Sequence, residues 1–267
     1  MSKKLFISAD IEGTAGICNW RETEKGGDLY EKFAALMTAE VAAAAQAALD
    51  LGWEVTIKDA HDSARNIDPE KLPAGCRLIR GWTGEPLCMM AGLETGHFDA
   101  AAYTGYHADA YSSGNPLAHT MTPSAHRVTL NGRTASEFTL NAYAAAELGV
   151  PSVFLSGDAA LCRDARELLP AITAVPTKTG IGGAVISKTP DEVCREIYDG
   201  MKRALLSDPA PCLPRLPEHF ELEIEYSKHT DAQRCACYPG AQRVDAKTVR
   251  FGADSFAEIN RAILFIL

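Results

Sequence analysis

LFISADIEG, residues 5–13, decides the fold of this chain, because a short and almost wholly apolar run ends abruptly in two acids. A run of this kind is typical of a parallel strand that is buried on both faces. A glycine-containing loop follows, then an alanine- and leucine-rich helix at about residues 29–50 that Gly52 would end, and then a second strand at residues 53–58. This strand–helix–strand unit predicts a right-handed parallel crossover.

The alternation of strands and helices continues along the chain. Further apolar runs predict strands at residues 78–81, 100–104, 153–155 and 171–178, with a flexible turn at 179–183. Helical patterns lie between them at residues 137–148, where Ser136 would be the N-cap, and at 159–169 and 190–206. We therefore predict an α/β fold with three layers, α/β/α, around a mainly parallel sheet.

A smaller α+β portion is expected at the C-terminal end. The proline-rich residues 209–217 are typical of a linker, residues 220–226 alternate apolar and acidic side chains as a half-exposed strand does, and 255–267 predict a closing helix. Residues 248–251 are a further strand candidate. This divides the chain into a catalytic α/β domain, residues 1–208, and a smaller portion, residues 218–267. Within the first domain, Asn131-Gly132 predicts a β-hairpin.

Composition narrows the class of protein. The chain has 267 residues, 46% of them hydrophobic, and a formal net charge of −9, which argues against nucleic acid or an anionic membrane as a partner. Its eight cysteines are scattered, and residues 1–13 lack the pattern of a signal peptide. No apolar stretch reaches the roughly 20 residues that a membrane span needs. We expect a cytoplasmic protein with free thiols.

Five acidic and histidine residues lie at the ends of predicted strands or the start of a predicted helix. They are Asp10, Glu12, His61, His107 and Glu137. Active sites of α/β proteins form at the carboxyl ends of their strands, so these side chains would gather at one edge of the sheet. Carboxylates and imidazoles gathered in this way are the usual ligands of a divalent metal that activates water. The pattern predicts a metallohydrolase.

Each candidate also has an ordinary interpretation. Asp10 and Glu12 fit a solvated strand end, and Glu137, taken alone, fits an acid at a helix N-terminus better than a metal ligand. His61 and His107 fit loop histidines that pack on the surface. If His61 is a ligand, Asp59 or Asp62 beside it could hold its imidazole ring. The metal hypothesis therefore rests on the combination of residues from several strands.

Two further residues are candidates for roles in the reaction. His119 lies in a loop after His107, and a histidine that is not a ligand is a natural general acid or base near neutral pH. Lys178 follows an apolar run and could stabilise an oxyanion. We favour a surface lysine whose apolar stem packs on the protein, rather than a catalytic residue.

The chain resembles the D-aminopeptidase family of metallopeptidases, whose type member is encoded with dipeptide-transport genes. The resemblance runs in order along most of the chain and is densest in the first two-thirds. The matching stretches are residues 8–13 with Gly16, 59–63, 105–108, 118–121, 131–133, Glu137 with 140–143, 156–158 and 167–170.

The resemblance implies a centre of two zinc ions per chain. Its ligands would be Asp10, Glu12, His61, His107 and Glu137, and His119 would be the catalytic histidine. The implied activity is the removal of an N-terminal D-amino acid from short peptides by metal-activated water. The family also implies a cytoplasmic homo-oligomer, which is a ring-like decamer in the type member.

Two other classes of function stay open at this point. One is another metal-dependent amidohydrolase or a phosphoesterase with similar ligands, although the chain has no obvious glycine-rich phosphate cradle beside a lysine. The other is a non-catalytic cytoplasmic peptide-binding protein. Zinc content and a hydrolysis screen with peptides and phosphate esters would separate these alternatives from the peptidase.

Overall fold

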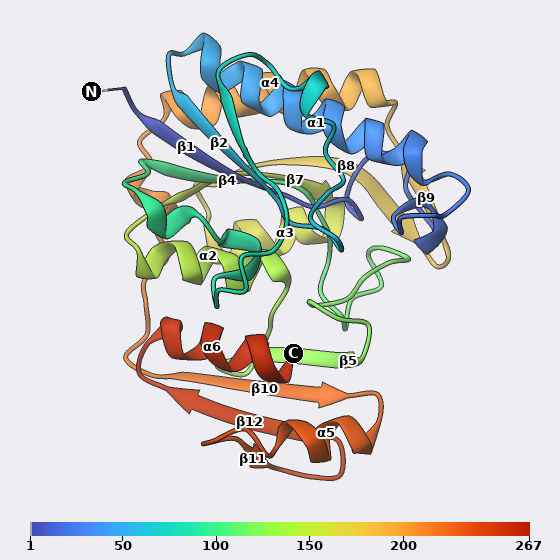
Figure 1. Cartoon of the computed structure of the whole chain (residues 1–267), viewed down its shortest axis with the longest axis vertical. Helices are drawn as coiled ribbons and strands as arrows, with labels where there is room; N and C mark the ends of the chain where they lie inside the picture. The colour runs from blue at the N-terminus through green and yellow to red at the C-terminus, as the bar shows by residue number, and fades with distance from the viewer. Residues whose placement is uncertain (1) are drawn as a thin grey trace.

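The computed structural model describes residues 2–267, and its centre is a seven-stranded sheet in the order β3-β2-β1-β4-β7-β8-β9 (Figure 1). Neighbouring strands from β3 to β8 pair in parallel, and β9 is antiparallel to β8. The strands are β1 (Lys4–Ala9), β2 (Glu54–Asp59), β3 (Cys76–Ile79), β4 (Ala100–Tyr106), β7 (Ser152–Asp158), β8 (Thr173–Ile181) and β9 (Ala184–Ser187).

Helices cover both faces of this sheet, which confirms the predicted three-layer α/β fold. α1 (Tyr30–Asp50) and α4 (Pro190–Leu206) lie on one face, and α2 (Glu137–Glu147) and α3 (Ala159–Leu168) lie on the other (Figure 1). Ala44, Ala45 and Ala48 of α1 are completely buried. Alanine favours the helix and its small side chain allows close packing, so the alanine-rich run forms a helix that lies tightly against the protein.

A second, five-stranded sheet lies beyond α2, in the order β11-β12-β10-β5-β6. Helix α6 (Phe256–Ile266) lies between this sheet and α2, and the short α5 (His229–Cys235) packs on β10 and β12 (Figure 1). The strands are β5 (Ala125–Leu130), β6 (Arg133–Thr134), β10 (Phe220–Tyr226), β11 (Gln242–Arg243) and β12 (Thr248–Ala253). The sheet thus takes strands from both sides of the predicted linker, and a division of the chain into two domains stays a prediction.

The predicted hairpin is present, because Asn131 and Gly132 have positive φ values of 50° and 78° and connect β5 to β6. Sequence patterns missed other short elements. The predicted turn at 179–183 is a second hairpin, in which β8 continues to Ile181, and α5 and β11 were not expected. The loops of the described part of the chain contain five 3-10 helices, at Trp20–Glu22, Pro69–Lys71, Cys88–Met90, Leu93–Thr95 and Ala210–Cys212. No helix among the described residues is both long and apolar enough to cross a membrane.

The strand order reverses between β1 and β4, and this switch point is where ligands bind in open α/β sheets. Two glycines allow the loop after β1 to approach the end of β4. The Gly13 N–H donates to the Gly105 carbonyl at 2.7 Å, and a Cβ on Gly13 would come within 1.8 Å of the Tyr106 carbonyl oxygen. Gly105 has φ +69°, which favours glycine. The loop that follows β1 is therefore held against the end of β4.

Candidate metal centre

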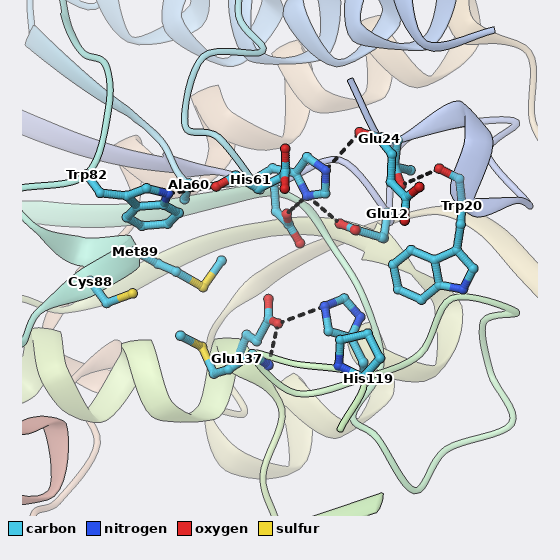
Figure 2. Close-up of a pocket in the computed structure, with 15 residues that line it drawn as sticks. Glu12, Trp20, Glu24, Ala60, His61, Trp82, Cys88, Met89, His119 and Glu137 are labelled. Atoms are coloured by element: carbon cyan, nitrogen blue, oxygen red, sulfur yellow. Dashed lines mark hydrogen bonds and ion pairs between the residues drawn. The ribbon is translucent and has the colours of Figure 1, made fainter. Parts of the chain in front are cut away.

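The five predicted residues lie together at the switch point. Asp10 and Glu12 follow β1, His61 follows β2, His107 follows β4, and Glu137 is the first residue of α2. All five are buried, and four of them line a cavity of about 300 Å³. Figure 2 shows Glu12 and His61 on one side of this cavity, facing Glu137 on the other.

Asp10, Glu12 and His61 form one group of close polar atoms. The Nδ1 atom of His61 lies 3.3 Å from Asp10 Oδ1 and 3.2 Å from Glu12 Oε2. His107, Glu137 and His119 form a second group. In it, His107 Nε2 lies 3.4 Å from Glu137 Oε2, and His119 Nε2 lies 3.4 Å from Glu137 Oε1.

Asp10 connects the two groups. While its Oδ1 faces His61, its Oδ2 lies 3.5 Å from His107 Nε2. A single carboxylate therefore faces a histidine of each group. This is the arrangement that a carboxylate needs in order to contact two neighbouring cations at once.

The three histidines each use one ring nitrogen on a backbone carbonyl. His61 Nε2 lies 3.0 Å from Thr23 O, His107 Nδ1 lies 2.9 Å from Ala108 O, and His119 Nδ1 lies 2.9 Å from Leu117 O. A carbonyl oxygen only accepts, so each of these nitrogens carries a hydrogen. In a neutral ring the other nitrogen then presents a lone pair to the carboxylates, as a metal ligand requires.

The unpaired atoms of the cluster fit a divalent cation. Asp10 Oδ2, both carboxylate oxygens of Glu12 and His107 Nε2 are buried and have no hydrogen-bond partner among the described residues. Buried polar atoms of this kind are costly unless something binds them. Two ligand atoms at zinc's tetrahedral bond lengths lie about 3.3 Å apart. The observed separations of 3.2–3.5 Å match that spacing.

Charges in the cluster depend strongly on one another. Burial, together with the adjacent Glu12, raises the pKa of Asp10 to about 8. Burial would lower the pKa of His107, but Glu137 beside it raises that pKa to about 10. Without a metal, protons therefore reside on this cluster near neutral pH. A cation that binds here must displace them.

His119 lies in the same cluster as the predicted ligands. Its ring stacks on His107, with centroids 4.3 Å apart, and burial and the His107 charge lower its pKa. The imidazole is therefore neutral near pH 7. This state suits a proton acceptor, and it suits a ligand of the second group equally well.

Glu137 begins α2, and its carboxylate is oriented by a backbone N–H. Ser136 is the N-cap of α2, as predicted, and its Oγ accepts the N–H of Thr139. The Met121 N–H donates to Glu137 Oε1 at 2.7 Å, and Met121 has a positive φ of 63°. A residue held in this uncommon backbone conformation next to polar side chains is typical of functional sites.

One predicted contact is wrong. The ring of His61 is held by the Thr23 carbonyl and not by Asp59 or Asp62. Asp59 instead accepts hydrogen bonds from Asn66 and Ile67, and the Asn66 side chain in turn donates to the His61 carbonyl at 2.6 Å. Asp59 therefore shapes the loop after β2. No sequence signal indicates Thr23, because any residue type offers the same carbonyl.

The interpretation of Lys178 as a surface lysine is also wrong. Its side chain is 3% exposed and its ammonium group donates to three backbone carbonyls of the loop after β1. An oxyanion role does not fit either, because the three donors of the ammonium group are already used.

Sequence patterns did not identify the walls of the cavity. Its apolar lining includes Trp20, Trp82, Met89 and Pro123, and Trp20 packs 5.3 Å from the His119 ring (Figure 2). These side chains come from loops without periodic patterns, so only the tertiary structure places them. Glu24 and Asp62 add acids to the lining, together with the thiol of Cys88. All eight cysteines are free thiols, as predicted.

Comparisons with known proteins agree with this geometry. A family model described as D-aminopeptidase matches residues 3–265. The chain is 30% identical to a D-aminopeptidase of Bacillus subtilis (strain 168) over 266 residues, which cover 98% of this chain and 95% of that protein. It is also similar to a solved structure described as the Zn-dependent D-aminopeptidase DppA from Bacillus subtilis, a self-compartmentalizing protease. The TM-score is 0.91 at 30% identity, and the match covers 98% of this chain and 96% of the other.

Proposed function

Since this chain belongs to the D-aminopeptidase family and is therefore an enzyme that hydrolyses peptides, we propose that it holds two zinc ions and removes an N-terminal D-amino acid from short peptides. The observation that carries the proposal is the carboxylate of Asp10, which faces a histidine in each of two groups of potential ligands. The zinc dependence named for the similar solved structure supports the choice of metal.

The ligands that we propose are Asp10, Glu12, His61, His107 and Glu137. Asp10 would contact both ions, Glu12 and His61 would complete one site, and His107 and Glu137 would complete the other. Carboxylate and imidazole are the donors that catalytic zinc sites use. Zinc bound there would polarise a carbonyl oxygen and lower the pKa of a water molecule from about 15.7 toward about 7.

His119 would handle the proton of the reaction. Its Nδ1–H is fixed on the Leu117 carbonyl, which leaves Nε2 directed toward the cluster. As a neutral imidazole it can accept a proton there and return it to the leaving amine. Trp20, packed against the ring, limits the positions that the imidazole can adopt and shields it from water.

The cavity favours a peptide that presents a free amino group. Its lining contains five carboxylates, namely Asp10, Glu12, Glu24, Asp62 and Glu137, and no lysine or arginine among the described residues. Asp10, Glu12 and Glu137 are proposed zinc ligands, so Glu24 and Asp62 remain to attract an ammonium group, and a phosphate would find no cationic side chain in this lining. Glu24 is exposed at the cavity and can receive the ammonium group. The chiral preference rests on the family description.

The same proposal includes the assembly and location of the enzyme. We expect a homo-oligomer, with a decamer as the specific hypothesis, and the self-compartmentalizing description of the similar structure supports the assembly. The free cysteines support a location in the cytoplasm. Light scattering of the purified protein would measure the size of the assembly.

Metal quantification coupled to a hydrolysis screen tests the proposal. Purified protein would be analysed for zinc and assayed on matched D- and L-aminoacyl peptides and on phosphate esters. We expect about two zincs per chain and cleavage of the free-amine D-peptides. His97→Ala is a suitable control, because that side chain is 86% exposed, away from the cavity. Preferential cleavage of L-peptides, or a protein that binds no zinc, would refute the proposal.

A further inference from the structure

Lys178 of β8 is a buried lysine whose whole hydrogen-bonding capacity is used on one loop. Its Nζ donates to the carbonyl oxygens of Glu12, Thr14 at 3.0 Å and Ile17 at 2.7 Å. These three acceptors lie in the loop that follows β1 and carries Asp10 and Glu12. An ammonium group has three N–H donors, so all of them serve this loop.

The neighbours of Lys178 hold the same loop. The Thr177 hydroxyl donates to the Gly13 carbonyl at 2.6 Å, and Asn115 Nδ2 donates to the Glu12 carbonyl at 3.1 Å. From α1, Glu40 Oε1 accepts the Ala15 N–H at 2.9 Å. These bonds hold the loop from β8, from the segment with Asn115 and from α1. Lys178 is the positively charged side chain among them.

The side chain of Glu12 makes this anchoring important. Neither of its carboxylate oxygens has a hydrogen-bond partner among the described residues, and its close polar neighbour is His61 Nδ1 at 3.2 Å. Before a cation binds, the carboxylate is held by this contact with His61 and by no hydrogen bond among the described residues. Its direction therefore depends on where the backbone of Glu12 is held, and Lys178 donates to the carbonyl of that residue.

We propose that Lys178 is a positioning residue, which fixes the backbone of Glu12 and thereby sets the affinity of the Asp10–Glu12–His61 group for its zinc ion. The inference rests on the proposed zinc function. Burying an ammonium group is costly unless it is fully hydrogen-bonded, and here each donor has an acceptor. The positive charge of Lys178 also interacts favourably with the carboxylates of Asp158, Glu40 and Glu12.

Lys58 offers a matched control within the chain. It is also a buried lysine of the seven-stranded sheet, on β2, and its Nζ donates to the carbonyls of Asp59 at 2.7 Å and Gly81 at 2.9 Å. It does not donate to the carbonyl of a proposed ligand. Lys58→Met and Lys178→Met each remove a buried charge and its bonds to backbone carbonyls, so a general loss of stability would affect both variants.

Zinc affinity tests the inference independently of turnover. The metal-free wild type, Lys178→Met and Lys58→Met would be titrated with zinc against a competing chelator. We expect two tight ions in the wild type and in Lys58→Met. In Lys178→Met we expect the zinc affinity of one site to be unchanged and that of the other to fall by about 10- to 100-fold. If Lys178→Met does not fold, Lys178→Arg replaces it, because a planar guanidinium keeps the charge but cannot reproduce three converging bonds.

The other outcomes separate the two proposals. If the Lys178 variant binds two zinc ions with wild-type affinity, this inference is overturned and the zinc function stays intact. Equal weakening of both ions in both lysine variants would overturn it as well, because the effect would then be a general loss of stability. A wild type that binds fewer than two zincs would refute the two-zinc function itself, and with it the role of Lys178.

Discussion

Asp10 Oδ2 and His107 Nε2 lie 3.5 Å apart across the switch point, and neither atom has a hydrogen-bond partner within residues 2–267. The two residues follow the adjacent strands β1 and β4, and Gly13 and Gly105 allow the two strand ends to approach so closely. Two buried acceptors that face each other in this way need a cation or a proton between them.

Replacing Asp10 by alanine should remove metal as well as activity. Because this carboxylate faces both groups of ligands, we expect Asp10→Ala to retain at most one zinc per chain and to have no measurable peptidase activity. Zinc analysis and a peptide assay provide the two measurements. Asp254→Ala, which removes an 87% exposed carboxylate, should behave like the wild type. An Asp10→Ala protein that keeps two zincs at unchanged affinity would refute the bridging role.

His119→Ala should separate catalysis from metal binding. If His119 handles the proton, the variant keeps both zincs while turnover falls by a factor of about 100 to 10,000. Its Nε2 atom lies 3.4 Å from Glu137 Oε1, so the same variant also tests a ligand role. Loss of one zinc would make His119 a ligand, and unchanged turnover would show that it has no part in the reaction.

Glu40 should make stability depend on pH. Burial raises its pKa from 4.5 to about 7, against the opposing effects of the Ala15 N–H and Lys178. A carboxyl whose pKa is raised on folding stabilises the protein below pH 4.5, and this contribution is lost as pH rises through about 7.

Comparison with Glu40→Gln isolates that contribution, because glutamine can still accept the Ala15 N–H. The unfolding free energy of the variant minus that of the wild type should be about 3 kcal/mol larger at pH 8 than at pH 4. Urea unfolding at both pH values, with chelator present, measures the difference. Parallel pH profiles for the two proteins would contradict the prediction.

Gly13→Ala should destabilise the protein and impair zinc binding together. A Cβ at this position would lie 1.8 Å from the Tyr106 carbonyl oxygen, which is backbone and cannot swing away. We expect a loss of about 3 kcal/mol in unfolding free energy, and weaker zinc binding because the loop with Asp10 and Glu12 must move. Gly96→Ala, where a Cβ meets nothing within 4 Å, is the control. Equal stability of the two variants would contradict the close approach.

The sequence was sufficient to predict the parallel strands of the main sheet and the polar residues at their ends, because apolar runs with acids or histidine at their ends have a distinct pattern. Asp10, His61 and His107 follow β1, β2 and β4 for that reason. Contacts through the backbone could not be predicted. The carbonyl of Thr23 that holds His61 has no residue signature, and Lys178 lies far along the chain from the loop that it binds.

The walls of the cavity could not be predicted for a related reason. Trp20 and Trp82 lie in irregular loops whose course depends on contacts distant in the sequence, such as the bond from Trp82 Nε1 to the Asp62 carbonyl. The β8–β9 hairpin was mistaken for a turn because glycines interrupt its strand pattern, although Gly180 pairs with Val185.

The bonds from Lys178 have a consequence for the order of events during synthesis. All the proposed zinc ligands have emerged from the ribosome once Glu137 has emerged. Lys178 on β8 emerges later, after α2, β7 and α3. At the earlier stage the Glu12 carbonyl can already accept the bond from Asn115, but the bond from Lys178 is still missing. If Lys178 sets zinc affinity as proposed, the Asp10–Glu12–His61 group would reach its full affinity only after β8, the last parallel strand, has joined the sheet.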